Sequence, residues 1–156
     1  MIRRYEPVST YLESLLMELR HVAAALPRGP RVTHIHWGGG SPNILSPVDI
    51  QRLAAATRSC FTVHRDAEFA VEIDPRQLDE DQMVAFAQAG VNRVSIGVQD
   101  FNADVQRAIN RSQSLDVTKR VLNGFRRLGI TSINIDLVYG LPHQTRQSVA
   151  HTLEDV

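Results

Sequence analysis

The sequence of 156 residues has only one cysteine, Cys60. A single thiol excludes a disulfide within the chain, and it excludes a metal site built from this chain's cysteines alone. Cys60 ends a helical pattern beside Phe61, and we expect it to be a small, buried packing residue.

An excess of either charge is also missing, because 17 Lys and Arg balance 17 Asp and Glu. Without a basic stripe or a polybasic segment, the sequence gives no reason to expect nucleic acid or a membrane surface as a partner. No apolar run is long enough to cross a bilayer, and residues 1–6 lack the apolar core of a secretory signal. We therefore predict a cytoplasmic protein with no nucleic-acid or membrane partner.

What the sequence does contain is a repeated alternation of strand and helix patterns. Strands are predicted over residues 32–37, 68–74, 93–98 and 132–138. Helices are predicted over 7–26, 47–60, 80–89 and 115–128, with a short helical turn near 102–109 and a last helix that opens at Thr145 and still runs at Val156. Repeated βα units predict a parallel sheet with helices outside it, and the length fits one domain over residues 1–156.

Alternate residues of a strand face opposite sides of its sheet, and one side of every predicted strand is apolar. The other side carries polar residues, namely His34, His36, Glu68, Glu72, Arg93, Ser95, Gln99, Asn134 and Asp136. An ordinary (β/α)₈ barrel fills its interior with aliphatic side chains, and unpaired buried polar groups cost several kcal/mol. The pattern therefore predicts a wet or liganded cavity inside part of a barrel. A doubly wound sheet would need two apolar faces, which argues against it.

Residues 36–42 read His-Trp-Gly-Gly-Gly-Ser-Pro at the end of the first predicted strand. Three glycines allow the backbone to approach a ligand closely, and their N–H groups suit a carboxylate, a phosphate or the amino-acid end of a cofactor. The ends of the later strands surround the same mouth with Glu72, Gln99 and Asp136. A tight βα turn is the alternative interpretation of the glycines, and an ion pair with Arg76 or Arg93 is the alternative for Glu72.

The pair His34 and His36 supports a competing hypothesis. A His-x-His pair at a strand end is how metal-dependent barrel hydrolases begin their metal site. The later strand ends supply no further histidine, so the pattern favours cofactor binding over a metal hydrolase.

Ordered motifs along the chain resemble those of oxygen-independent coproporphyrinogen III oxidases, the radical S-adenosylmethionine (SAM) enzymes of haem biosynthesis. Residues 36–42 are similar to the family's His-Trp-Gly-Gly-Gly-Thr-Pro, with Ser41 in place of threonine. Further matches lie at 72–76 (Glu-Ile-Asp-Pro-Arg), 95–102 (Ser-Ile-Gly-Val-Gln-Asp-Phe-Asn), 110–111 (Asn-Arg) and 134–142 (Asn-Ile-Asp-Leu-Val-Tyr-Gly-Leu-Pro). Trp37, Asp74 and Asp100 favour the oxidases over haem chaperone-like radical SAM proteins.

The resemblance implies an α/β fold, a partial TIM-type barrel of about four βα units. It implies SAM and a [4Fe–4S] cluster as cofactors, an electron donor for the cluster, and oxidative decarboxylation of coproporphyrinogen III to protoporphyrinogen IX. By position it implies seven cofactor-binding residues, Gly39, Gly40, Ser41, Glu72, Gln99, Arg111 and Asp136. Arg111 lies in a predicted loop, where an arginine is most often solvated, so without the resemblance its position would give little support for a binding role.

One feature of the family is missing from the sequence. The three-cysteine motif that holds the cluster precedes the matching region in the family, and Cys60 cannot replace it. The resemblance thus implies an internal fragment, without the cluster-binding strand and the C-terminal domain, and with no catalytic residue or metal ligand of its own. Two functions stay open: part of the catalytic domain of an oxidase, inactive alone, or a non-catalytic remnant that at most binds SAM or a partner.

Overall fold

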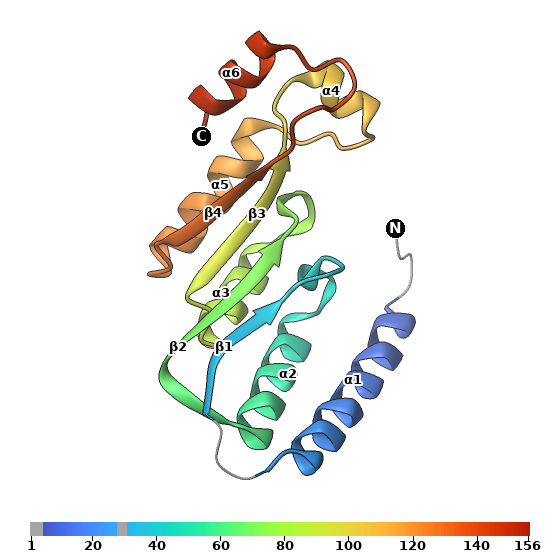
Figure 1. Cartoon of the computed structure of the whole chain (residues 1–156), viewed down its shortest axis with the longest axis vertical. Helices are drawn as coiled ribbons and strands as arrows, with labels where there is room; N and C mark the ends of the chain where they lie inside the picture. The colour runs from blue at the N-terminus through green and yellow to red at the C-terminus, as the bar shows by residue number, and fades with distance from the viewer. Residues whose placement is uncertain (1–4, 28–30) are drawn as a thin grey trace.

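The computed structural model of the chain describes residues 5–27 and 31–156 (Figure 1). Four strands form one sheet in the order β1-β2-β3-β4, and each neighbouring pair is parallel. The strands are β1 (Arg31–Trp37), β2 (Thr62–Ile73), β3 (Arg93–Gln99) and β4 (Ser132–Leu137). This sheet confirms the predicted parallel α/β architecture.

Figure 1 shows all six helices of the described residues. They are α1 (Glu6–Ala25), α2 (Pro47–Cys60), α3 (Glu80–Gln88), α4 (Ala103–Ala108), α5 (Leu115–Arg127) and α6 (Arg146–Glu154), with 3₁₀ turns η1 (Pro42–Ile44) and η2 (Pro75–Gln77). The row of helices along one face of the sheet comprises α1, α2, α3 and α5, whereas α4 and α6 lie beyond the carboxyl ends of β3 and β4 (Figure 1). Side-chain caps fix several helix starts. Ser46 accepts a hydrogen bond from the Asp49 N–H, and Asp79 forms a capping box with Gln82. No helix among the described residues is both long enough and apolar enough to span a membrane.

The core lies between the sheet and this row of helices. The helix-facing side chains of the two central strands are almost fully buried, and they are Phe69, Val71, Ile73, Val94, Ile96 and Val98. Phe86 of α3 and Phe125 of α5 fill the same layer, and Trp37 packs edge-on against Phe69 with ring centroids 4.9 Å apart. The predicted apolar face is therefore confirmed, and the opposite face is left for polar groups.

Three details differ from the sequence-based expectations. β2 begins at Thr62 rather than residue 68, because Thr62 and Val63 pair with the start of β1 before an irregularity in the register. α6 ends at Glu154 instead of continuing to Val156. Cys60 is partly rather than fully buried, because it is the last residue of α2.

Candidate functional site

The sheet face opposite the helices carries hydrogen-bonded polar side chains. On β3 and β4, Ser95 donates to Asp136 Oδ2 at 2.7 Å and Asn134 Nδ2 donates to Asp136 Oδ1 at 2.7 Å. Both carboxylate oxygens of Asp136 are thus oriented by neighbours on the same face. The prediction of a polar face on all four strands is confirmed.

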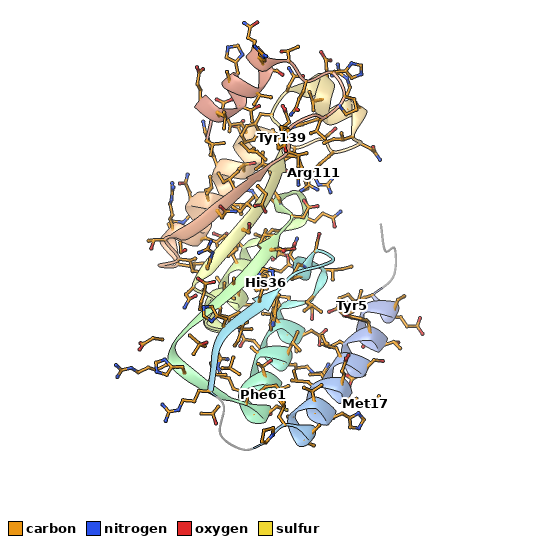
Figure 2. All side chains as sticks on the ribbon, viewed as in Figure 1. Tyr5, Met17, His36, Phe61, Arg111 and Tyr139 are labelled. Carbon is orange, nitrogen blue, oxygen red and sulfur yellow. The ribbon has the colours of Figure 1, made fainter. Side chains whose placement is uncertain are left out.

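The carboxylate of Glu72, near the end of β2, is held from the end of β1. His36 Nε2 lies 3.1 Å from Glu72 Oε1, and the Gly39 N–H donates to Glu72 Oε2 at 3.3 Å. The alternative ion pairs do not form, because Arg76 pairs with Asp74 and Arg93 pairs with Glu68. Figure 2 shows His36 on β1, toward the end of the sheet where the glycines follow.

The three glycines differ in what surrounds them. A Cβ at Gly38 would lie 2.7 Å from His36 Nε2 and 2.8 Å from the Glu72 carboxyl group. By contrast, a Cβ at Gly39 or Gly40 would meet no heavy atom within 4 Å, and Gly39 has a φ of +95°. Ser41 follows with a hydroxyl that makes no capping hydrogen bond to η1. The loop is therefore an open cradle of backbone N–H and hydroxyl groups beside a fixed carboxylate.

Arg111 reaches the end of β3 from the loop that follows α4. Its Nη2 donates to the Gly97 carbonyl at 2.8 Å, and its buried Nε has no hydrogen-bond partner. Gln99 ends β3 at a register shift with a φ of +73°. A Cβ at Gly97 would come within 3.2 Å of Arg111 Nη2 and 3.3 Å of Gln99 Nε2, so the missing side chain lets both groups lie over the strand.

Two arginines surround one carboxylate at this corner. Burial opposes ionisation of Asp74, but hydrogen bonds from the side chain and backbone of Arg76 outweigh it, with help from the Arg111 charge, and the pKa of Asp74 lies below its usual value. Burial lowers the pKa of the Arg111 guanidinium, and the attraction of Asp74, 3.6 Å away, offsets this only in part. The corner holds more positive than negative charge, and the orphaned Arg111 Nε is a donor without an acceptor.

Replacing Asp74 tests this electrostatic arrangement. We expect Asp74→Asn to lower the free energy of unfolding at pH 7 by about 1–3 kcal/mol, because it weakens hydrogen bonds to a charged acceptor and leaves two arginines together. A folded-state pKa below the unfolded value of about 3.9 stabilises the fold above that pH and loses this effect as the pH falls through the folded value. The gap between wild type and variant, measured by urea denaturation, should therefore narrow below about pH 4.

The matched control for that experiment is Asp104→Asn. Asp104 is exposed and pairs with Arg107 on α4, and exposed ion pairs contribute little. Equal losses of stability in Asp74→Asn and Asp104→Asn at pH 7 would contradict the claim that the two arginines beside Asp74 stabilise its charged form.

The structure places all seven predicted site residues at the carboxyl end of the sheet, but in separate groups. Glu72 and Gly39 contact each other, and Gln99 and Arg111 share the space over Gly97. Asp136 is held by Ser95 of β3 and Asn134 of β4. Gly40 and Ser41 line the open loop. The predicted list omitted His36, although its position on the same face as Glu72 on an adjacent strand was a usable signal.

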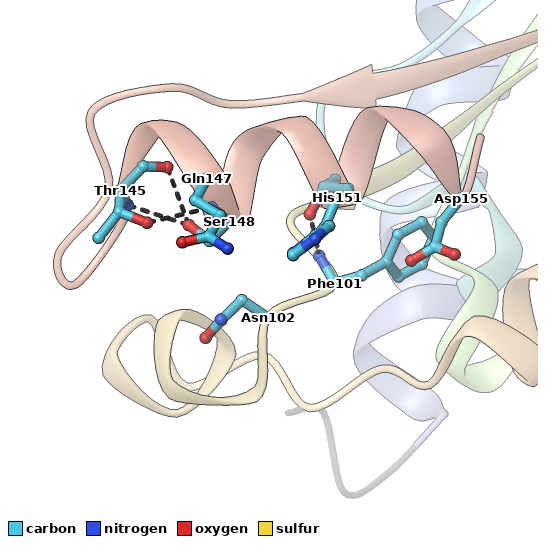
Figure 3. A pocket seen from close by; sticks show the side chains of 8 residues that line it. Phe101, Asn102, Thr145, Gln147, Ser148, His151 and Asp155 are labelled. Carbon is cyan, nitrogen blue, oxygen red and sulfur yellow. Dashed lines mark hydrogen bonds between the residues drawn. The ribbon is translucent and has the colours of Figure 1, made fainter.

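Two cavities adjoin this end of the molecule. One, of about 300 Å³, lies between α6 and the start of α4 and is lined by Phe101, Asn102, Ser148, His151 and Asp155 among others; it contains none of the seven predicted residues (Figure 3). The other, of about 520 Å³, lies between α1 and the end of β1, and its lining includes Gly40 and Ser41. The glycine loop thus borders open space.

A half-barrel of parallel strands with a glycine cradle and polar strand ends defines a class of protein. The model of the radical SAM superfamily matches residues 4–156, and the chain belongs to that superfamily. Members of the superfamily use SAM and a [4Fe–4S] cluster.

Within the superfamily, coproporphyrinogen III oxidases are among the proteins that the chain resembles in sequence. The chain is 48% identical over 150 residues to "Coproporphyrinogen III oxidase, anaerobic 1" of Cereibacter sphaeroides, covering 96% of this chain and 33% of the relative. It is 47% identical over 150 residues to the oxygen-independent coproporphyrinogen III oxidase of Paracoccus denitrificans, again covering 96% of this chain and 33% of the relative. The predicted resemblance is confirmed.

A solved structure supports the same relationship. The coproporphyrinogen III oxidase (HemN) of Escherichia coli, a radical SAM enzyme, superimposes with a TM-score of 0.92 at 42% identity, covering 98% of this chain and 35% of that chain. This match confirms the predicted partial barrel. The chain spans about a third of the length of these relatives.

The residues of this chain fit the two cofactors differently. The open glycine cradle and the orphaned Arg111 Nε fit a polar organic ligand such as SAM. A [4Fe–4S] cluster does not fit, because thiolates hold such clusters and the chain has only Cys60. In the part of the chain that the structure describes, no three His, Cys, Asp or Glu side chains are placed to hold a metal ion.

Proposed function

We propose that this chain forms the SAM-binding wall of an oxygen-independent coproporphyrinogen III oxidase, which decarboxylates coproporphyrinogen III oxidatively to protoporphyrinogen IX. The observation that carries the proposal is the carboxylate of Glu72, oriented by His36 and Gly39 beside an open backbone cradle. The identity of 44–48% to oxidases along nearly the whole chain supports the choice of substrate.

The charges at the strand ends suit the amino-acid part of SAM, which carries an ammonium and a carboxylate. Glu72 offers an anion for the ammonium group, and the open backbone after Gly39, where a Cβ at Gly40 would meet no heavy atom within 4 Å, offers room and N–H donors for the carboxylate. Arg111 adds positive charge and a free Nε donor at the neighbouring strand end. This division assigns Gly39, Gly40, Ser41, Glu72 and Arg111 to the charged end of the ligand.

The remaining two residues suit neutral hydroxyl groups. Asp136 presents carboxylate oxygens, and the amide of Gln99 can both donate and accept. We assign them to the sugar hydroxyls of SAM. When bound, SAM supplies the radical for this chemistry, while the residues of this chain bind and orient the cofactor. The cluster and an electron donor for it complete the proposed system.

Binding of SAM to the purified chain tests the proposal directly. We expect isothermal titration calorimetry to detect one saturable binding event, which Glu72→Ala weakens by about tenfold or more because a charged partner is lost. Asp116→Ala is a control of the same charge change on the exposed start of α5. Circular dichroism checks that each variant is folded, and a folded wild type that fails to bind SAM would contradict the proposal.

Because the chain has a single cysteine, we also predict that it does not assemble an iron–sulfur cluster by itself. After anaerobic reconstitution with iron and sulfide, the chain alone should show no stoichiometric cluster absorbance in the visible range, because Cys60 alone cannot supply the thiolates. The full-length E. coli relative, reconstituted in parallel, is the positive control. A stoichiometric cluster on this chain would mean that the ligand assignment is wrong.

The second candidate function is a SAM-binding domain without catalysis. A chimera separates the two candidates, with residues 1–156 replacing the matching third of the E. coli relative. Formation of protoporphyrinogen IX by the chimera supports the oxidase. A chimera that binds SAM and the cluster but forms no product supports the non-catalytic domain.

A further inference from the structure

His36 is not among the seven predicted cofactor-binding residues, but its contact with Glu72 indicates a role for it. We infer that His36 is a positioning residue, which holds the Glu72 carboxylate in the direction that receives the charged group of the ligand. The identity of that ligand rests on the proposed function, whereas the pairing exists in the chain without a ligand.

Strand register places the two side chains together. His36 of β1 lies opposite Ala70 of β2, and Glu72 lies two residues further along β2 on the same face. Diagonal neighbours of this kind are within reach of long side chains in a sheet. Since Ala70 is small, it leaves room over β2 for the imidazole, and His36 Nε2 reaches Glu72 Oε1 at 3.1 Å.

The backbone of the glycine loop completes this arrangement. The Gly39 N–H donates a hydrogen bond to the second carboxylate oxygen of Glu72, Oε2, at 3.3 Å, so each oxygen accepts from one donor. The imidazole and the carboxylate together fill the space that a Cβ at Gly38 would need. Three residues of one motif therefore act on one carboxylate: His36 with its imidazole, Gly38 by the absence of a side chain, and Gly39 with its N–H.

His36 matters because the Glu72 side chain is not confined by packing. Its side chain is 46% exposed, so without a partner on Oε1 it would sample several rotamers. A carboxylate already held in its binding direction loses less conformational entropy when the ligand arrives. Of the two neutral tautomers of imidazole, the one with its proton on Nε2 can donate this hydrogen bond.

Binding of SAM to histidine variants tests the inference. We expect His36→Ala to raise the dissociation constant about tenfold, and His36→Gln to restore it to within about threefold, because a glutamine amide can reach the position of Nε2. His34→Ala is the matched control, since His34 lies on the same strand and contacts Thr33 instead. Thermal melting should be nearly unchanged in all three variants, because His36 is 58% exposed.

A double-variant cycle separates positioning from direct contact. If His36 acts through Glu72, His36→Ala should change SAM affinity little further in the Glu72→Ala background. Additive losses in that cycle, or failure of glutamine to restore affinity, would overturn the positioning role.

A readout without SAM keeps the inference separate from the proposed function. Two-bond ¹H–¹⁵N spectra of labelled histidines report the tautomer, and His36 should carry its proton on Nε2 in the wild type and become a tautomer mixture in Glu72→Ala. A fixed tautomer with no SAM binding by the wild type would count against the proposed function alone. An identical His36 spectrum in Glu72→Ala would overturn the pairing, even if SAM binds.

Discussion

Gly38→Ala is expected to weaken SAM binding by about tenfold to a hundredfold while the chain stays folded. The new methyl group would lie 2.7 Å from His36 Nε2 and 2.8 Å from the Glu72 carboxyl group. Both neighbours are the ends of side chains that reach into solvent, so they can move aside at little cost to the fold. What they cannot do is move aside and keep their hydrogen bond.

Calorimetry measures this effect, and Gly124→Ala is the control. A methyl group at Gly124 also meets a side chain, at 2.6 Å from the Met83 sulfur, but within the helix layer on the other side of the sheet. Gly124→Ala should lower the free energy of unfolding and leave SAM affinity unchanged. His36→Ala removes one of the two groups that the new methyl group meets. The double variant Gly38→Ala with His36→Ala should therefore lose less SAM affinity than the sum of the losses in the two single variants. Wild-type affinity in Gly38→Ala would contradict this description of the site.

The alternation along the strands made the fold and its two faces predictable. A period of two, repeated in four strands, assigns Val94, Ile96 and Val98 to the core and Ser95 to the opposite face whatever the neighbouring strands do. The same local pattern could not predict the extra pairing at the start of β2. Residues 64–67 lie opposite Thr33 alone, and the polar run His64-Arg65-Asp66 within them is typical of a loop.

The site was predictable in its residues but not in its contacts. The motifs placed Glu72, Gln99 and Asp136 at strand ends, but the partner of Glu72 depends on the register between β1 and β2, which no single strand contains. The left-handed backbone of Gln99, at a φ of +73°, is likewise a product of the register shift against β4, because local preference would assign such a φ to glycine. Arg111 could be placed over Gly97 only once the loop after α4 was folded.

Asp100→Ala is expected to have the largest effect on stability, about 3 kcal/mol or more. Asp100 is 1% exposed, and its carboxylate accepts from the Asn102 N–H at 2.6 Å, Gln144 Nε2 at 2.6 Å and Thr152 Oγ1 at 3.2 Å. Alanine would leave these donors without their acceptor at a buried site. Asp100→Asn should be less damaging than alanine, because the amide keeps one acceptor oxygen. It should still cost stability, because the amide NH₂ would face the donors that the second carboxylate oxygen accepts from.

The loss should begin at α6 rather than spread evenly through the sheet. Thr152 is the buried residue of α6, so this helix is attached by a polar contact to Asp100 instead of by an apolar face. In hydrogen–deuterium exchange, amides of α6 should therefore lose protection first, ahead of those in β2 and β3. Asp116→Ala on α5 is the control for loss of an exposed carboxylate. Uniform loss of protection across the sheet in Asp100→Ala would mean that the carboxylate supports the core, whereas selective loss at α6 identifies it as the anchor that joins the last helix to the end of β3.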